Sequence, residues 1–370
     1  MGSQTKYTVV QVGLGHRGSI QMQAFIELSD RFEIAGICDM NPAALEAAGE
    51  RFSVPPPRRY ADAEAMLAEV RPDILSFSTM PDVRAEMVEL AVKYGVKGLM
   101  MEKPMATTLE EARRIAEMCG RSGIKAVVCH QHKYFSSFIK LREIIDSGEL
   151  GEIYRIDASC QPHASQLGTH YIDYVLWANN GCRALSVAGH VHGSFFLADN
   201  HPSPDFVLGE IVFENGVRSI FECGYFSKPH AEHDEGFTYK PKSQDYWTDD
   251  RLTVYGTTGY AWAECSGRWG AFTPRTGGRA VTGETQDYSL EVYPAQARYT
   301  LDFARWMDDG EKVHSCNIHT ACHGYEILEA MYMSALERTR VDLPVPLPLK
   351  YDAITELKKH LSPVTYRKFP

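Results

Sequence analysis

The chain has 370 residues, of which 44% are hydrophobic and 23% are charged, and its formal net charge at pH 7 is −10. This length predicts two or three domains with sizeable cores. The negative net charge does not favour binding to nucleic acid or to an anionic membrane. The sequence has no stretch of 18 consecutive apolar residues, so we expect no membrane span. Nine scattered cysteines without a CxxC pair, and a start without an apolar leader, predict a cytoplasmic protein with reduced thiols.

Short β-branched runs alternate with helical segments in the first third of the chain. The predicted strands are Tyr7–Val12, Phe32–Cys38, Ile74–Ser78, Gly98–Met101 and Lys125–Cys129. The predicted helices are Ile20–Leu28, Pro42–Phe52, Ala63–Val70, Val83–Tyr94 and Leu109–Ser122. Repeated β-α units of this length predict an α/β fold with a doubly wound parallel sheet, of the Rossmann type, over residues 1–129.

After Cys129 the pattern changes, and residues 130–370 are assigned to a second domain. The predicted helices are Phe138–Asp146, a segment around Asp173–Trp177, and Thr320–Arg338. The predicted strands are Glu210–Phe213, Val217–Phe221, Arg251–Tyr255 and Tyr260–Ala263. Asn215 and Gly216 separate two of these strands and form a strong hairpin signal. We therefore expect an α+β domain with a largely antiparallel sheet.

A glycine-rich motif follows the first predicted strand. Its residues are Gly13, Leu14, Gly15, His16, Arg17 and Gly18, in the spacing GxGxxG. In this context the first glycine makes a tight turn, the second lets the backbone approach a pyrophosphate, and the third lets helix and strand pack closely. The helix N-terminus adds N–H groups and a partial positive charge. The motif predicts a dinucleotide site, against the alternative of a turn without a ligand.

Asp39 ends the second predicted strand, 21 positions after Gly18. A carboxylate here would accept hydrogen bonds from a ribose 2′-OH and repel a 2′-phosphate. The following residues, Met40, Asn41 and Pro42, include no cation that would hold such a phosphate. The sequence therefore favours NAD over NADP.

Glu102, Lys103 and Pro104 follow the predicted strand Gly98–Met101. In open α/β sheets, ligands bind at the carboxyl ends of the strands, so this charged pair is expected in the crevice. Lys103 could hydrogen-bond a substrate hydroxyl. The alternative is a solvated turn between a strand and a helix.

These motifs together resemble the Gfo/Idh/MocA family of oxidoreductases. The resemblance is carried by GLGHRG at 13–18, Asp39, EKP at 102–104, QHKY at 131–134, GELGEIY at 148–154 and GTHYID at 168–173. It implies an N-terminal Rossmann domain and a C-terminal domain with an open antiparallel sheet. It also implies oxidation or reduction of sugars, cyclitols and related compounds with a nicotinamide cofactor, in a homodimer or homotetramer.

The resemblance also implies roles for particular residues. Lys103 would contact the nicotinamide ribose and the substrate, and His170 would be the catalytic histidine. The expected cofactor-binding set is the glycine-rich motif with Asp39, Thr79, Pro81, Glu102, Lys103 and Gln131. The expected substrate-binding set is His132, His163, Gln166, Asp173 and Tyr246. Tyr246 belongs to an aromatic group, with Phe237, Tyr239 and Trp247, that could stack on a sugar ring or simply be core.

Three positions depart from the family pattern. The family commonly has an aspartate four residues before the catalytic histidine, where this chain has Gln166. Helical spacing would place Gln166 and His170 on one face, but glutamine cannot ionise and can only orient a neighbour. Asp173 would share that face and could steer the imidazole or meet the substrate. Met80 precedes Pro81 where the family commonly has a Thr-Pro dipeptide, and Arg84 stands where a histidine is common.

The residue types suit hydride chemistry at a hydroxyl group. A histidine can take the hydroxyl proton, and a lysine can polarise the oxygen. We therefore predict an NAD-dependent oxidoreductase with His170 as general acid/base and Lys103 as its electrostatic partner. Two alternatives are a redox-neutral enzyme that retains NAD while cleaving glycosides, and a non-catalytic NAD-sensing regulator.

Two histidine pairs raise the question of a metal. His319 and His323 are spaced i, i+4, and His190 and His192 are spaced i, i+2. Such pairs can share a face of a helix or strand, but no third ligand is fixed by spacing. We predict no metal site.

Overall fold

The computed structural model describes residues 5–224, 248–309 and 311–363, and these fold into two compact units. The first unit runs to Tyr134 and also includes Val292–Cys322; the second comprises Phe135–Glu291 and the chain from His323 onward. The sequence pattern assigned residues 130–370 to the second domain, so residues 130–134 and the segment Val292–Cys322 are the difference. In the described part of the chain, no helix has the length and apolar character needed to cross a bilayer.

The first unit contains a six-stranded sheet in the order β3-β2-β1-β4-β5-β6. Its strands are β1 (Tyr7–Val12), β2 (Phe32–Cys38), β3 (Arg59–Tyr60), β4 (Ile74–Phe77), β5 (Gly98–Met101) and β6 (Lys125–Val128). All neighbouring strands pair in parallel. The strand order reverses between β1 and β4, which confirms the predicted doubly wound fold.

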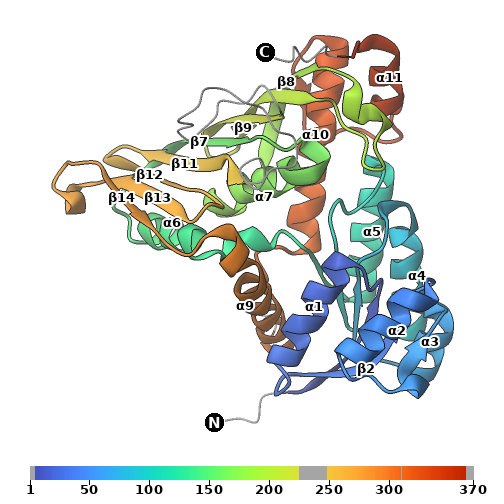
Figure 1. The fold of residues 1–370 in the computed structure, drawn as a ribbon. Coiled ribbons are helices and arrows are strands. Elements are labelled where there is room, and N and C mark those ends of the chain that lie inside the picture. Colours follow the sequence, from blue (N-terminus) through green and yellow to red (C-terminus); the bar gives the residue numbers. More distant parts are fainter. Residues whose placement is uncertain (1–4, 225–247, 310, 364–370) are drawn as a thin grey trace, which may run out of the picture. The chain divides into compact units, whose positions relative to one another are not determined.

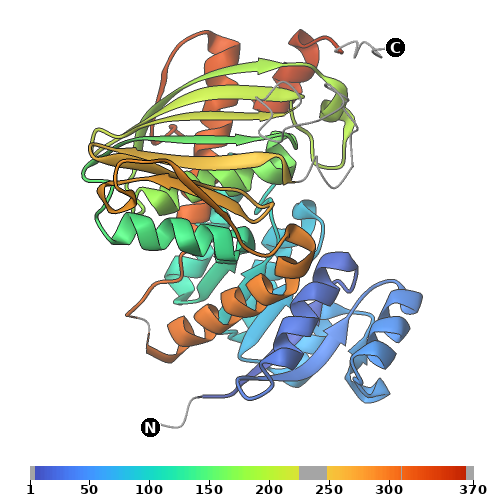
Figure 2. The same cartoon turned by 60° about the vertical axis from the view of Figure 1, so that its left-hand side comes forward.

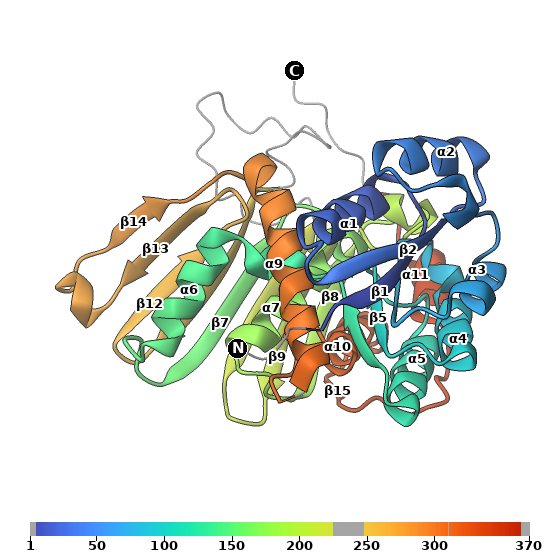
Figure 3. The ribbon, with the colours of Figure 1, turned by 90° about the horizontal axis from the view of Figure 1, so that it is seen from below.

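Five helices connect these strands. They are α1 (His16–Glu27), α2 (Pro42–Arg51), α3 (Ala63–Val70), α4 (Arg84–Tyr94) and α5 (Leu109–Ser122). The side chains of Asn41, Asp62 and Thr108 cap α2, α3 and α5 by accepting backbone N–H groups of the first turn. The first helix begins at His16, four residues earlier than predicted, because Gly15 is its N-cap. Figures 1 and 3 show α1 on one face of the sheet and α3, α4 and α5 on the other.

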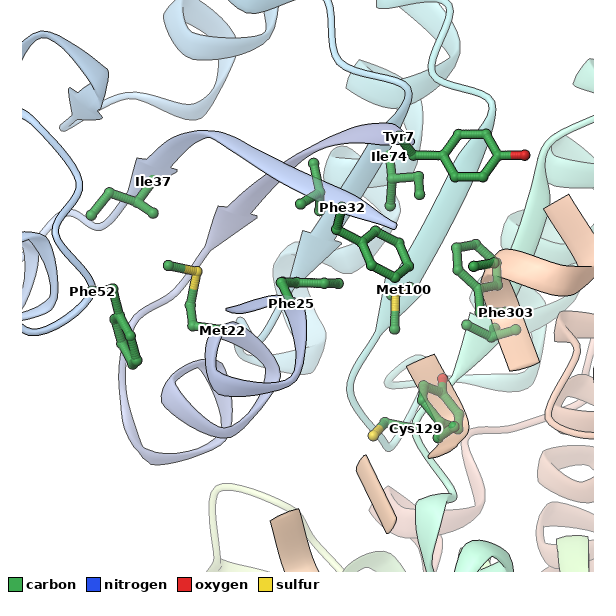
Figure 4. Packing of buried hydrophobic residues seen from close by; sticks show 14 of the residues in the cluster. Tyr7, Met22, Phe25, Phe32, Ile37, Phe52, Ile74, Met100, Cys129 and Phe303 are labelled. Carbon is green, nitrogen blue, oxygen red and sulfur yellow. The ribbon is translucent and has the colours of Figure 1, made fainter. Parts of the chain in front are cut away.

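Segments distant in sequence complete the core of the first unit (Figure 4). Phe25 of α1 and Phe32 of β2 lie with their ring centroids 5.3 Å apart. Phe303, from the helix α9 (Tyr288–Asp309), packs in the same cluster as Met100. A Cβ atom at Gly98 would lie 3.0 Å from the Phe303 ring, so the strand leaves room for this helix. Burying each such side chain stabilises the fold by roughly 1.5–3 kcal/mol.

The second unit contains a nine-stranded sheet in the order β14-β13-β12-β11-β7-β10-β9-β8-β15. Its strands are β7 (Ile153–Cys160), β8 (Ala184–His192), β9 (Phe206–Phe213), β10 (Arg218–Gly224), β11 (Asp250–Gly256), β12 (Gly259–Ala263), β13 (Arg268–Phe272), β14 (Val281–Glu284) and β15 (Val341–Asp342). The β10–β7 pair is parallel and the other described pairs are antiparallel. The prediction of a largely antiparallel sheet is confirmed, although β7, β8, β13, β14 and β15 were not predicted.

Helices pack against this sheet (Figure 2). They are α6 (Ser136–Asp146), α7 (Thr169–Ala178) and α10 (Ile318–Glu337), with α11 (Ala353–His360) near the end of the chain. The first of these packs on β12 and β13, and α7 packs on β7, β10 and β11. Met331 of α10 lies against Gly189 and Gly209, where a Cβ atom would approach it within 2.3 and 2.7 Å, respectively. Glycine is therefore required at Gly189, where the contact is with the backbone of α10, whereas at Gly209 the contact is with the flexible end of the Met331 side chain.

A buried carboxyl group begins β11. Asp250 is 0% exposed, and its Oδ1 accepts a hydrogen bond of 2.8 Å from the backbone N–H of Cys265. Burial raises the pKa of Asp250 to about 8, and the hydrogen bond from Cys265 offsets part of that effect. The folded protein therefore holds this carboxyl group mainly in its protonated form at neutral pH.

We expect the wild-type protein to lose stability relative to Asp250→Asn as the pH rises from about 4 to about 8. The unfolded carboxyl group has a pKa of about 3.9, so in this window the folded state keeps a proton that the unfolded state has released. The stabilisation is complete below about pH 4 and is lost as the pH passes the folded value, by at most about 1.4 kcal/mol per pH unit. Melting temperatures of both proteins across this range provide the measurement, and parallel curves would contradict the prediction.

Candidate functional site

The glycine-rich turn of the first unit is closely packed at its two ends. Gly13 has a φ of +81°, and a Cβ atom there would lie 2.8 Å from the carbonyl oxygen of Ser78. A Cβ atom at Gly18 would lie 1.9 Å from the carbonyl oxygen of Gly13. The backbone N–H of Gly13 donates to the carbonyl oxygen of Cys38 over 2.9 Å. The first and third glycines are therefore needed by the turn itself.

Gly15 differs from its two neighbours in the motif. A Cβ atom at this position would meet no atom within 4 Å, and the φ of −66° is one that any residue can adopt. Gly15 is the N-cap of α1, and because glycine has no side chain, no side-chain group caps the helix. The N–H groups of the first turn are thus available to an anionic group that approaches over open space. This arrangement fits the pyrophosphate of a dinucleotide. Leu14 is buried and His16 is exposed.

Asp39 holds the glycine-rich turn in addition to any role toward a ribose. Its Oδ2 accepts the backbone N–H of Leu14 over 2.8 Å, and its Oδ1 accepts the backbone N–H of Asn41 over 2.9 Å. A carboxylate has about four acceptor positions, so both oxygens can accept further hydrogen bonds. Asp39 therefore links the turn after β1 to the start of α2.

Glu102 lies at the centre of a buried polar group at the ends of β5 and β6. Its Oε1 accepts from Nε of Arg17 and from Nε2 of Gln21, each over 2.9 Å. Burial would raise the pKa of Glu102, but the charge and the hydrogen bond of Arg17 outweigh burial and hold it below its usual value. Nη2 of Arg17 also donates to Oε1 of Gln296 over 3.1 Å and to Sγ of Cys129 over 3.2 Å. The carboxylate is therefore ionised and fixes Arg17.

Lys103 follows directly, and the Lys103–Pro104 peptide bond is cis. Burial lowers the pKa of Lys103 to about 8; the neighbouring Glu102 opposes this effect, whereas Arg17 and Arg84 add to it. Lys103 therefore changes between its ammonium and amine forms close to neutral pH. Its ammonium form can still donate hydrogen bonds to an oxygen of a ligand below about pH 8.

Arg84 joins the loops that follow β4 and β5. It is 2% exposed, and its Nη2 donates to the carbonyl oxygens of Thr79 over 2.7 Å and of Lys103 over 3.3 Å. Burial lowers the pKa of Arg84 to about 10, so the guanidinium group stays charged at neutral pH. Thr79 and Pro81, both expected near the cofactor, therefore lie on a loop that Arg84 ties to Lys103.

The segment after β6 forms a short 3₁₀ helix, η3 (Gln131–Tyr134). Gln131 and His132 are 4% and 5% exposed. Oε1 of Gln131 accepts from Sγ of Cys129 over 3.4 Å. Burial lowers the pKa of His132 to about 3, and the positive charges of Arg17 and Lys103 lower it further. His132 is thus a neutral imidazole in the same group as Lys103.

The second unit carries four predicted residues on one continuous segment. His163 precedes the π-helical turn η4 (Ala164–Gly168), which contains Gln166 and leads directly into α7 with His170 and Asp173. His170 and Asp173 are 3% and 0% exposed. Nδ1 of His170 lies 3.0 Å from the hydroxyl oxygen of Tyr174.

One expectation about this segment is corrected. Gln166 and His170 were expected to share a face of one α-helix, but Gln166 lies in the π-helical turn and His170 in the first turn of α7. A π turn closes i→i+5 hydrogen bonds and holds more residues than an α turn, so an i, i+4 pair that crosses it does not align in the usual way.

His163 is held from three sides within the second unit. Its Nδ1 lies 3.0 Å from the hydroxyl oxygen of Ser165, and its ring stacks on Phe196 with centroids 4.3 Å apart. Its Nε2 lies 4.0 Å from a carboxylate oxygen of Asp199. These contacts fix His163 at the start of the segment that carries His170.

The structure thus forms two groups, one in each unit. The group of the first unit contains Gly13, Leu14, Gly15, His16, Arg17, Gly18, Asp39, Thr79, Pro81, Glu102, Lys103, Gln131 and His132. The group of the second unit contains His163, Gln166, His170 and Asp173. Tyr246, with Phe237, Tyr239 and Trp247, lies outside the described residues. Within the described ranges, no cluster of three or more His, Cys, Asp or Glu side chains is arranged to hold a metal ion.

Gln21, Gln296 and Tyr174 were not among the predicted site residues. Gln21 lies on α1 one turn after Arg17 and binds the same carboxylate, so helical spacing could have found it. Tyr174 follows His170 by four residues, and the same spacing could have found it. Gln296 contacts Arg17 across 279 positions of sequence, and no local pattern signals such a contact.

A doubly wound sheet with a glycine-rich turn open at a helix N-terminus defines the class of dinucleotide-binding α/β proteins. Residues 7–130 match the model of an oxidoreductase family with an NAD-binding Rossmann fold, GFO_IDH_MocA. The predicted resemblance to the Gfo/Idh/MocA family is therefore confirmed over residues 7–130, which match the NAD-binding Rossmann fold of that family.

Individual relatives extend the comparison. D-apiose dehydrogenases from Paraburkholderia graminis and Rhizobium rhizogenes are 26% and 28% identical to this chain over 238 residues. Each match covers 60% of this chain and, respectively, 61% and 66% of the relative, so the chain spans less than two thirds of these relatives' length. A solved levoglucosan dehydrogenase, in complex with NADH and levoglucosan, has a TM-score of 0.76 and is 16% identical, covering 92% of this chain and 100% of its own. That structure shares the fold.

Proposed function

We propose that this protein is an NAD-dependent oxidoreductase that acts on a secondary hydroxyl group of a sugar, cyclitol or glycoside. The observation that carries the proposal is in the first unit. Open space above Gly15 leaves the N–H groups at the start of α1 accessible to an anion, and Arg84 holds the backbone of Lys103 at the end of β5. The D-apiose dehydrogenases and the levoglucosan dehydrogenase support the substrate class by their names.

Each residue of the proposed site has one task. The N–H groups at the start of α1 would hold the pyrophosphate, and Asp39 would accept hydrogen bonds from a ribose. Bound NAD would supply the acceptor for the hydride. Lys103 would donate a hydrogen bond to the substrate oxygen and stabilise negative charge that develops there. His170 would take the hydroxyl proton as general base, and Gln166 and Asp173 would contribute contacts to the substrate.

The choice of NAD over NADP is part of the proposal, because Asp39 places a carboxylate beside the glycine-rich turn. We expect Asp39→Ala to reduce the preference for NAD over NADP by about tenfold, since it removes the charge that repels a 2′-phosphate. The ratio of the two dissociation constants is the readout, because the loss of the contacts to Leu14 and Asn41 weakens both cofactors alike. An unchanged ratio would remove the argument for NAD.

The experiment that tests the proposed activity follows absorbance near 340 nm while products are separated. The protein is mixed with NAD and a panel of sugars, cyclitols and glycosides, and the variant His170→Asn is measured in parallel. NADH that grows in proportion to an oxidised product supports the proposal. Product without net NADH would instead indicate the redox-neutral reaction, and binding of NAD without any reaction would indicate a regulator.

We also propose a cytoplasmic location and a homodimer or homotetramer. All nine cysteines are free thiols, as a reducing compartment favours. The oligomer follows from the family resemblance, and light scattering on the purified protein measures it.

A further inference from the structure

One hydrogen bond in the second unit fixes the imidazole that the proposed function uses. Nδ1 of His170 lies 3.0 Å from the phenolic oxygen of Tyr174, one helical turn further along α7. The two ring planes are inclined by 79°, so the residues meet through the hydroxyl group and not by stacking. Because His170 is 3% exposed and Tyr174 is 0% exposed, bulk water does not compete for this contact.

The ring of Tyr174 is itself held by other aromatic side chains. Phe138 of α6 lies with its centroid 5.2 Å away at an angle of 61°, and Tyr171 lies 5.1 Å away at 57°. Tilted contacts of this kind stabilise an aromatic pair. They restrict the ring on two sides, so the hydroxyl group stays where Nδ1 of His170 meets it.

The chemistry of imidazole gives this contact a consequence. A neutral histidine carries one proton, which can reside on either nitrogen, and only the nitrogen without it can act as a base. If the Tyr174 oxygen accepts the hydrogen bond, the proton resides on Nδ1 and Nε2 has the lone pair. In the Ser-His-Asp triad of hydrolases, the aspartate that binds Nδ1 of the catalytic histidine performs the same task.

We propose that Tyr174 is a positioning residue that holds His170 in the tautomer with its proton on Nδ1. This inference rests on the proposed function, in which His170 is the general base. Tyr174 takes this role in a chain that has Gln166 where the family commonly has an aspartate. A phenol is neutral at physiological pH, so it orients the imidazole without adding a negative charge beside it.

The unmodified protein supplies the first test. Nitrogen-15 NMR of histidine-labelled protein distinguishes a protonated from an unprotonated ring nitrogen, and the variant His170→Asn identifies the signals of His170 by their loss. At neutral pH we expect the signal of a protonated Nδ1 and an unprotonated Nε2. The opposite assignment would overturn the proposal.

Tyr174→Phe supplies the second test, because phenylalanine keeps the packing against Phe138 and removes the hydroxyl group. We expect kcat to fall about tenfold, the affinity for NAD to stay unchanged, and the proton of His170 to distribute between both nitrogens. The matched control is Tyr332→Phe, which removes the hydroxyl of another buried tyrosine of the second unit, on α10. The control is expected to keep the tautomer and kcat of wild type.

The two proposals fail in different ways. If His170→Asn keeps full activity, the role of His170 as base is wrong, whereas the tautomer signals of wild type and Tyr174→Phe still test the hydrogen bond. If Tyr174→Phe keeps both the tautomer and kcat of wild type, the positioning role of Tyr174 is wrong while the proposed activity stands.

Discussion

Lys103→Met is expected to lower kcat by about 10²–10³-fold while the protein stays folded. Methionine has nearly the same length as lysine, but it donates no hydrogen bond to a substrate oxygen and carries no charge. The loss of one such donor from a buried site costs about this factor. Steady-state kinetics with the substrate identified at 340 nm measure it.

The same lysine predicts the pH dependence of the wild-type enzyme. Because burial lowers the pKa of Lys103 to about 8, its ammonium form is lost as the pH rises through that value. Turnover should therefore fall on the alkaline side, and Lys103→Met should lack this limb.

Lys97→Met is the matched control for this prediction. Lys97 is 68% exposed at its side chain and pairs with Asp73 over 2.8 Å, in the same unit. It should keep wild-type kinetics at every pH. A near-normal rate for Lys103→Met would exclude Lys103 from the reaction.

Gly15→Ala is expected to weaken NAD binding by about 100-fold, which corresponds to ~2.7 kcal/mol, without lowering the melting temperature. The backbone at Gly15 already suits any residue, and the added Cβ atom would touch nothing within 4 Å of the protein. The cost therefore appears only when a pyrophosphate approaches the start of α1. Calorimetric titration with NAD and a melting curve measure the two quantities.

Two other glycines serve as controls. Gly120→Ala on α5 adds a Cβ atom no closer than 3.6 Å to His319, and NAD binding should not change. Gly18→Ala forces a Cβ atom to 1.9 Å from Gly13, so it should destabilise the fold itself. Unchanged NAD affinity in Gly15→Ala would contradict a pyrophosphate site at this turn.

Much of the first unit could be predicted from sequence, because its longer strands are short apolar runs and several of the helices between them begin at clear N-cap residues, such as Asn41 and Thr108. The strands at the centre of its sheet appear at their predicted positions within one residue. The two-residue strand Arg59–Tyr60 was missed because it is too short to show a pattern.

The second unit was harder to predict for identifiable reasons. In β7, Arg155 and Asp157 pair with each other over 2.7 Å on the strand, and these charges interrupt the apolar run that signals a buried strand. The helix α9 contains Pro294, a residue that ordinarily ends a helix, and so the helix was not predicted.

The residues of the candidate site also differ in how far the sequence predicts them. Glu102 and Lys103 follow an apolar strand, which is a local signal, and their position at the carboxyl end of β5 could be inferred from topology alone. The contact of Arg17 with Gln296 depends on how a helix from the last third of the chain packs in the first unit. Contacts of this kind follow from the three-dimensional fold and leave no mark in the spacing of residues.

The composition of the first unit from two stretches of chain has a consequence for synthesis on the ribosome. Tyr299 and Phe303 are completely buried in its core, yet they are translated after the whole run Phe135–Glu291. The glycine-rich turn and its sheet can form early, but their core is complete only when Cys316 and the residues around it have emerged. The core of the nascent first unit therefore remains incomplete, with an apolar face uncovered, while most of the second unit is being synthesised.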